Sequence, residues 1–325
     1  MRASRRAVLP LLAAPLWARV GPAAAQSGAF PSKPIRIIVP FANGSGADSN
    51  TRYHAEELSK LLGQPIVVEN RPGGNGAVGI GIVKQAPADG YTMLTASNSP
   101  MSVNPHVLKS LPYDPTTDLR PVAGLFRGLM GFMVAGDSRY KSLQDLLDAA
   151  RGEKRKISVG TYSQGYQLAA AWWSTLTGAE LNYVAYKGLS QAMTDLIGGQ
   201  IDLAVVDLGG ALPLAKDGKA RALAVSGDSR SPELPDVPTM QQLGFKDFVT
   251  YTWCAFYVNA ATPDDIVDKL ADAMQKVLNT PAAREYAVRN SWEQMPLAPA
   301  AMREFHLADS ERYRKIAEAA RIEKQ

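Results

Sequence analysis

Short apolar runs alternate with amphipathic helical stretches along this chain, and no other feature of the sequence restricts the fold as strongly. Residues 35–39, 66–69 and 91–96 are rich in β-branched and apolar side chains, as buried strands are. Residues 49–62 and 77–84, which lie between these runs, place apolar side chains at helical spacing. A strand–helix–strand–helix–strand order is typical of parallel strands covered by helices. We therefore expect an α/β fold.

The same order repeats further along the chain, which indicates a second α/β unit. The expected strands are residues 132–135, 157–160, 181–184, 203–206 and 222–225, with helices at 143–150, 166–176, 190–197 and 211–216 between them and at 264–278, 281–289 and 299–320 after them. At about 100–200 residues per domain, 325 residues fit two such units.

No Gly/Ser-rich linker separates the two units, so we expect two lobes joined by ordered crossovers near residues 124–130 and between residues 227 and 252. Four segments follow: a leader at 1–25, lobe 1 at 26–126, lobe 2 at 127–250, and a return to lobe 1 at 251–325. Each lobe is expected to be a mainly parallel sheet flanked by helices, with a cleft between the lobes.

The first 25 residues have the layout of a secretory signal peptide. Basic residues come first, residues 7–17 are apolar, and Ala23-Ala24-Ala25 gives an A-x-A cleavage pattern after Ala25. A membrane anchor is the weaker interpretation, because the apolar run is shorter than the roughly 20 residues that span a bilayer. The Arg5-Arg6 pair also resembles a twin-arginine signal, and the ordinary secretory route stays open. Either route predicts a periplasmic protein.

The charge of the chain argues against a nucleic-acid partner. The net charge is +4, with 35 basic and 31 acidic residues. Four of the arginines lie in residues 1–25, which contain no acidic residue, so 31 basic and 31 acidic residues remain after cleavage. A neutral mature chain lacks the positive surface with which proteins attract polyanions.

Residues suited to catalysis or metal binding are sparse. The three histidines lie far apart, and the single cysteine, Cys254, sits in the apolar run 253–258, where we expect a buried side chain. The segment 74–79 matches G-x-G-x-x-G, but residues 70–73 separate it from the preceding strand and no acid follows at residues 97–99. We therefore predict a binding protein with no metal, no cofactor and no catalytic residues.

The loop after the first strand, residues 41–48, is the best candidate for ligand contact. Gly44 and Gly46 are expected to adopt positive φ angles and to bring backbone N–H groups close to a ligand. Asp48 is expected to cap the following helix. The remaining N–H groups at the helix start favour an anion such as a carboxylate. An ordinary strand-to-helix turn is the alternative.

Eight short segments stand out along the chain: residues 31–41, 63–74, 88–92, 111–115, 186–188, 198–203, 218–225 and 234–239. In sequence and in order these segments resemble the periplasmic solute-binding proteins of the tripartite tricarboxylate transporter class, also called Bug proteins. The resemblance implies a two-lobed fold of the type II periplasmic-binding-protein class, with the ligand in the cleft. It also implies no catalysis and delivery of the ligand to integral-membrane transporter subunits.

The resemblance also implies a second ligand loop at residues 160–167, so that each lobe contributes one loop to a small carboxylate. The candidate ligand-binding residues are Phe41, Asn43, Gly44, Ser45, Gly46, Asp48, Ser97, Thr161, Ser163, Gln164 and Asp207. Asp207 matches a family aspartate near the cleft and would either accept a hydrogen bond from a ligand amine or hydroxyl, or cap the next helix.

Two departures from the family pattern prevent transfer of a ligand identity. Asn43-Gly44-Ser45-Gly46 stands where the family has Pro-Gly-Gly-Gly. The second loop carries Tyr162 and Tyr166, with Gln167 where the family has a histidine. Bulkier side chains should narrow the cleft and add directional hydrogen bonds.

We expect a monomer that binds a small organic carboxylate. Two other functions stay open at this point. A sensor subunit would bind the same ligand but signal to a membrane kinase. A serine hydrolase would use Ser45 or Ser163, although Ser45 lacks the G-x-S-x-G motif.

Overall fold

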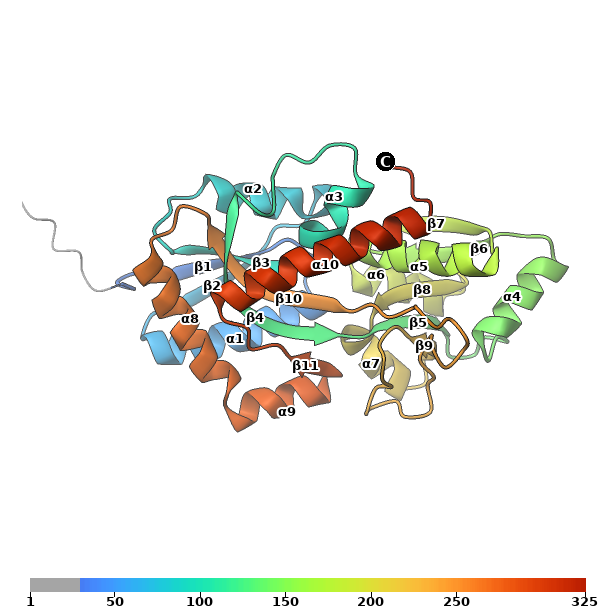
Figure 1. Cartoon of the computed structure of the whole chain (residues 1–325). Coiled ribbons are helices and arrows are strands. Elements are labelled where there is room, and N and C mark those ends of the chain that lie inside the picture. The colour runs from blue at the N-terminus through green and yellow to red at the C-terminus, as the bar shows by residue number, and fades with distance from the viewer. Residues whose placement is uncertain (1–29) are drawn as a thin grey trace, which may run out of the picture. The chain divides into compact units, whose positions relative to one another are not determined.

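Residues 30–325 are described by a computed structural model, in which two β-sheets carry helices on their faces (Figure 1). The predicted signal peptide, residues 1–25, lies outside the described residues. Strands and helices alternate along most of the described chain, which confirms the α/β class. Among the helices of residues 30–325, none has the length and apolar composition needed to cross a membrane.

The first sheet has six strands, taken from both ends of the described chain. They are β1 (Ile35–Val39), β2 (Ile66–Asn70), β3 (Thr92–Ser97), β4 (Leu119–Gly128), β10 (Thr252–Asn259) and β11 (Trp292–Gln294), in the order β11-β4-β10-β3-β1-β2. β1 is parallel to β2 and β3, whereas β10 is antiparallel to β3 and β4. The helices of this lobe are α1 (Gly46–Leu62), η1 (Gly74–Gly76), α2 (Ala77–Gln85), η2 (Ser99–Val103), α3 (Asn104–Val107), α8 (Asp264–Leu278) and α9 (Pro281–Arg289).

The second sheet has five strands, all from the middle of the chain. They are β5 (Met130–Ala135), β6 (Ile157–Thr161), β7 (Leu181–Ala185), β8 (Leu203–Asp207) and β9 (Ala220–Val225), in the order β7-β6-β8-β5-β9. β6 is parallel to β7 and β8, whereas β5 is antiparallel to β8 and β9. The helices of this lobe are α4 (Leu143–Gly152), α5 (Gln164–Thr177), α6 (Leu189–Ile197) and α7 (Leu208–Lys216).

Both sheets are mixed, which corrects the prediction of mainly parallel sheets. Four of the five antiparallel pairs of the described residues arise at the strands through which the chain enters each sheet from the other lobe, β5 in one sheet and β10 in the other; the fifth joins β11 to β4. β4 ends at Gly128 and β5 begins at Met130, so Leu129 alone separates strands of different sheets. No helix precedes β5 within its own sheet, so the strand–helix–strand rule for parallel neighbours does not apply to it.

The central strand β8 of the second sheet is a nearly continuous apolar run because both of its faces are covered. In β8, Leu203 and Val205 pack in the same cluster as Trp173 of α5. Ala204 and Val206, which point to the opposite face, pack with residues of α6. Such strands read as unbroken apolar segments rather than alternating ones.

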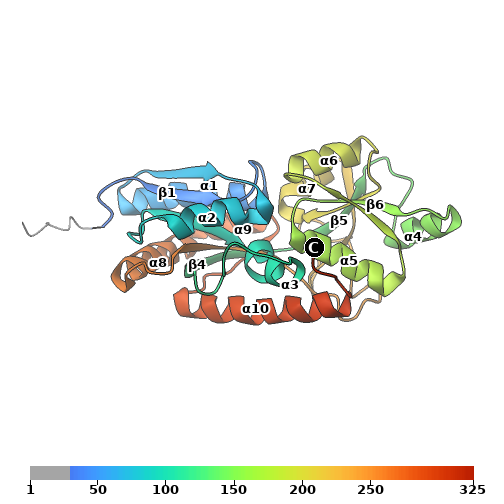
Figure 2. The same cartoon turned by 90° about the horizontal axis from the view of Figure 1, so that it is seen from above.

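Helix α10 (Pro299–Ala319) lies along both lobes (Figure 2). Met302, near its start, packs in the cluster that contains Trp253 of β10. Tyr313 and Ile316, near its end, pack in the cluster that contains Trp173 of α5. One rigid helix therefore contacts the cores of both lobes.

Candidate ligand-binding site

The loop after β1 turns at Gly44 and enters α1 three residues earlier than the sequence predicts. Ser45 is the N-cap: its Oγ accepts a hydrogen bond from the Asp48 N–H at 3.2 Å. Asp48 lies inside the helix, and its Oδ2 accepts from the Gly44 N–H at 2.9 Å. The prediction that Asp48 caps the helix is therefore wrong, because the extended backbone of Ser45 places a hydroxyl at the capping position.

The two glycines of this loop serve different purposes. Gly44 has a φ of +80°, as expected. Gly46, as the first residue of α1, does not have a positive φ, which corrects that prediction. A Cβ atom at Gly46 would lie 2.7 Å from Oδ1 of Asp207, too close for any real contact. Residue 46 is thus a glycine because the Asp207 carboxylate of the other lobe leaves no room for a side chain there.

Asp207 ends β8 and caps α7, and only 2% of it is exposed. Each of its carboxylate oxygens lies 3.2 Å from the Gly210 N–H, which donates to them. Burial raises the pKa of Asp207, and the donors around the carboxylate, first among them the Gly210 N–H, oppose that rise. The carboxylate at the start of α1 is therefore one that the protein itself supplies.

The loop after β6 provides the second wall. Ser163 precedes α5 in an extended conformation, and its side chain does not cap the helix. Ser99, which follows β3 in the other lobe, donates from its Oγ to Oγ of Ser163 at 2.9 Å and accepts from the Gly165 N–H at 3.0 Å. These bonds connect the two lobes at the cleft.

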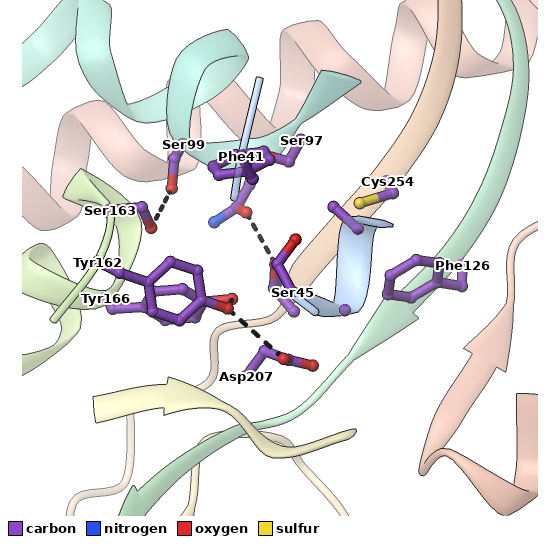
Figure 3. A pocket seen from close by; sticks show the side chains of 14 residues that line it. Phe41, Ser45, Ser97, Ser99, Phe126, Tyr162, Ser163, Tyr166, Asp207 and Cys254 are labelled. Atoms are coloured by element: carbon purple, nitrogen blue, oxygen red, sulfur yellow. Dashed lines mark hydrogen bonds between the residues drawn. The ribbon is translucent and has the colours of Figure 1, made fainter. Parts of the chain in front are cut away.

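Two tyrosines of this second loop stand over Asp207. The Tyr162 hydroxyl donates to that of Tyr166 at 3.1 Å and lies 3.5 Å from Oδ2 of Asp207 (Figure 3). Burial raises the pKa of both phenols well above their ordinary value, so both stay neutral near pH 7.

A small inner pocket of about 20 Å³, room for little more than one water-sized group, lies between these walls (Figure 3). Its lining residues are Phe41, Ser45, Gly46, Ala47, Ser97, Asn98, Ser99, Phe126, Tyr162, Ser163, Tyr166, Asp207, Thr252 and Cys254. Hydroxyl groups dominate this lining, and Asp207 is its one charged side chain. The inner pocket therefore offers neutral hydrogen-bonding groups around a single negative charge.

An outer pocket of about 370 Å³ adjoins the inner one through Phe41, Ser99, Tyr162 and Ser163. Its other lining residues are Pro40, Pro72, Gly73, Gly74, Asn75, Gly76, Gln164, Tyr186 and Lys187. The glycine-rich segment that fails as a nucleotide motif therefore lines the cleft. Lys187 gives this outer pocket a positive charge.

The structure brings seven of the eleven predicted residues to the two pockets. Phe41, Ser45, Gly46, Ser97, Ser163 and Asp207 line the inner pocket, and Gln164 lines the outer one. Asn43, Gly44, Asp48 and Thr161 line neither pocket. Asp48 instead supports the loop, since its Oδ1 accepts from Asn70 at 2.9 Å and pairs with Arg52 at 3.0 Å.

Sequence reasoning missed the contribution of β10 to the inner pocket. Thr252 and Cys254 are two residues apart on this strand, so they share one face. The sequence predicts only an apolar run at residues 253–258, with no strand assigned to it, although the alternation of Thr252 and Cys254 is typical of one. Cys254 is buried as predicted, and burial raises the pKa of its thiol well above the ordinary value, which keeps the thiol protonated.

The described pocket lining offers no histidine to activate a serine nucleophile. No histidine is among the lining residues of either pocket in the described chain. His54 is buried within α1, its Nδ1 contacts the Asn50 carbonyl at 2.9 Å, and burial lowers its pKa to about 4. Residues 30–325 contain no group of three or more His, Cys, Asp or Glu side chains arranged to hold a metal ion.

Comparison with known proteins agrees with this geometry. Residues 51–321 match the model of the tripartite tricarboxylate transporter family receptor. The chain belongs to this family. Receptors of this family are periplasmic solute-binding proteins, so the chain is a binding protein and not an enzyme. The type II two-lobed architecture that the resemblance implied is confirmed by the solved relatives.

Three relatives illustrate how similar this receptor is to its family. BugT of Bordetella pertussis is 32% identical, over 79% of each chain. The structure of R. palustris Rpa4515 with adipate has a TM-score of 0.88 and 29% identity, covering 91% of this chain and 100% of that one. MatC of Rhodopseudomonas palustris with bound malate has a TM-score of 0.83 and 25% identity, covering 88% of this chain and 99% of that one.

Proposed function

We propose that this receptor closes its lobes on a small organic carboxylate and delivers it to the integral-membrane subunits of a tripartite tricarboxylate-type transporter. The observation that carries the proposal is that loops from two different lobes, residues 41–48 and 161–167, meet at one pocket. Rpa4515 and MatC, which share this fold, are described with adipate and malate, and both of these ligands are carboxylates.

The second loop supplies the main grip on the carboxylate in this proposal. The Ser163 side chain does not cap α5, and Ser99 Oγ accepts only from the Gly165 N–H, so the partial positive charge of this helix start faces the cleft beside Ser163 and Gln164. Ser45 and Phe41 complete the cradle from the other lobe, with the Ser45 hydroxyl as a further donor. Asn43, Gly44, Asp48 and Thr161 act by shaping the loops that carry these groups.

A thermal-shift screen of small carboxylates against the refolded, ligand-free mature chain tests the binding proposal. A ligand at about 100 times its Kd stabilises the native state by about 2.7 kcal/mol, which corresponds to several degrees in Tm. We expect at least one carboxylate to give such a shift, with matched alcohols and hydrocarbons giving none. A screen in which no carboxylate raises the Tm would contradict the proposal.

The transport proposal needs a separate measurement. Cells that lack this chain should lose uptake of the carboxylate identified in the screen, and plasmid-borne chain should restore it. A sensor subunit would instead leave uptake by existing transporter subunits unchanged. We further propose that the mature protein is a monomer and binds no nucleic acid.

Export is proposed to use the signal peptide of residues 1–25. The mature chain isolated from the periplasm should begin at or next to Gln26, which N-terminal sequencing checks. Replacing Arg5 and Arg6 together by lysine should block export by the twin-arginine route. Unchanged export of that variant would indicate the ordinary secretory route.

A further inference from the structure

We infer that Asp207 determines which chemical group of the ligand enters the inner pocket: a hydrogen-bond donor, hydroxyl or ammonium, and not a second carboxylate. The ligand class is then a hydroxy- or amino-carboxylate. The inference rests on the proposed carboxylate-binding function and assigns an orientation to the ligand within that site.

The charge distribution of the two pockets is the first argument. Asp207 is the one charged side chain lining the inner pocket, and no Lys, Arg or His lies among the other lining residues. The positive side chain of the cleft, Lys187, lines the outer pocket. A ligand carboxylate in the inner pocket would face the buried Asp207 carboxylate without a cation between them, and such like-charge pairs are strongly disfavoured.

The start of α1 supplies the second argument. In the described structure Asp207 lies so close to Gly46 that a Cβ atom there would meet both carboxylate oxygens, at 2.7 and 3.0 Å. The partial positive charge of α1 is therefore already balanced by a carboxylate of the protein. An anionic ligand group is better placed at the start of α5, where no carboxylate of the protein lies, Ser99 Oγ accepts only from the Gly165 N–H, and the helix borders the outer pocket.

The surroundings of Asp207 favour a donor as its ligand partner. The hydrogen bonds that Asp207 accepts are long. The Gly210 N–H is shared between its two oxygens at 3.2 Å, and the Tyr162 hydroxyl, which also donates to Tyr166, lies at 3.5 Å. A ligand hydroxyl or ammonium at the usual charge-assisted distance of about 2.5–2.9 Å would form a shorter and stronger hydrogen bond than these. Ser45 and Thr252, which line the same pocket, can accept or donate toward that group.

The experiment compares three probes of equal length: adipate, 6-hydroxyhexanoate and 6-aminohexanoate, together with their four-carbon analogues. Calorimetry gives the affinity of each probe for the wild-type mature chain, for Asp207→Asn and for Asp217→Asn. Asparagine keeps the cap of α7 and the volume of the side chain but removes the charge. Asp217, at the other end of α7, lies outside both pockets and is the matched control.

We expect the wild-type chain to bind at least one of the hydroxy or amino acids about tenfold more tightly than the dicarboxylate of equal length, which corresponds to about 1.4 kcal/mol. Asp207→Asn should remove or reverse this preference, and Asp217→Asn should keep it. Asp207→Ser, which also retains a capping side chain, replaces the asparagine variant if that variant does not fold.

Three results would overturn the inference. A wild-type chain that binds the dicarboxylate as tightly as its analogues would remove the preference, and the proposed carboxylate-binding function would still stand. A preference that survives in the Asp207 variants would show that another group causes it. If none of the probes binds, the inference fails, and the thermal-shift screen of other carboxylates decides the proposed function separately.

Discussion

Gly46 and Asp207 show how a single residue pair can decide both shape and chemistry at the cleft. Gly46 begins a helix of one lobe, and Asp207 caps a helix of the other. Any side chain at Gly46 would collide with the Asp207 carboxylate. Gly44, two residues earlier, faces no such obstacle: a Cβ there would lie 3.6 Å from the nearest atom, Oγ of Ser190, but its φ is +80°.

The matched pair Gly46→Ala and Gly44→Ala separates these two requirements. Gly46→Ala should weaken ligand binding by about tenfold or more, because closing the lobes would force a contact far inside van der Waals distance. Gly44→Ala should lower the free energy of unfolding by about 1–2 kcal/mol through backbone strain and leave affinity nearly unchanged. Calorimetry and urea unfolding measure the two effects. Normal ligand affinity in Gly46→Ala would mean that the lobes of the bound protein do not meet at this pair.

At the scale of elements, α1 contains a histidine whose titration should be visible in the stability of the whole protein. His54 is buried, and burial lowers its pKa from 6.5 to about 4. Between these values the unfolded chain binds a proton that the folded chain does not. The free energy of unfolding should therefore fall as the pH drops from 6.5 towards 4, by up to about 3 kcal/mol.

Replacing His54 by glutamine tests this pH dependence. The variant should lose much of the decline in stability between pH 6.5 and 4, as urea unfolding at several pH values would show. His106→Gln is the control. The pKa of His106 is also lowered, but this side chain is only half-buried, so the variant should change the pH dependence less. An unchanged decline in His54→Gln would show that His54 titrates normally in the folded protein.

Most helices and strands could be predicted from the sequence, and the exceptions have identifiable physical causes. β8 is a short apolar run between two helices, a pattern that predicts a buried strand. β10 is an unbroken apolar run with no helix directly before it in sequence, and periodicity alone does not distinguish such a run from a helix. β4 contains Pro121, which usually excludes a strand; here it pairs with Tyr257 next to a register shift and beyond the reach of β11, which pairs only with residues 126–128.

The candidate site could be predicted from the sequence less completely than the fold. Residues near helix starts, such as Ser45 and Ser163, could be selected because loops that follow parallel strands gather at one edge of a sheet. The close approach of Gly46 to Asp207 joins residues from different lobes, and nothing local in the sequence encodes it. The same holds for Thr252 on β10, whose position in the cleft depends on the return of the chain to the first sheet.

At the scale of the molecule, α10 and the crossovers determine how the lobes are held together. Tyr313 of α10 donates to the Tyr251 carbonyl at 2.8 Å, accepts from Asn98 at 3.0 Å, and contacts the Thr250 hydroxyl at 2.9 Å. These partners belong to the end of β3 and to the return crossover. The lobe limits of residues 26–126, 127–250 and 251–325 stay a prediction.

Tyr313→Phe should therefore destabilise the protein, while the matched change Tyr257→Phe should not. Losing the Tyr313 hydroxyl leaves buried polar groups without a partner, at a cost of about 1–3 kcal/mol. The buried Tyr257 hydroxyl has no hydrogen-bond partner, so removing it should be neutral or slightly stabilising. Urea unfolding of both variants measures the difference. Equal stability of the two variants would contradict a linking role for Tyr313.

The central claim is that this chain holds a small carboxylate between its lobes without changing it. Titration calorimetry of the refolded mature chain with carboxylates of about three to six carbons, followed by recovery of the bound compound, tests that claim most directly. We predict saturable binding of at least one compound at one site per chain, with the compound recovered chemically intact. Absence of binding across the series, or recovery of a converted product, would contradict it.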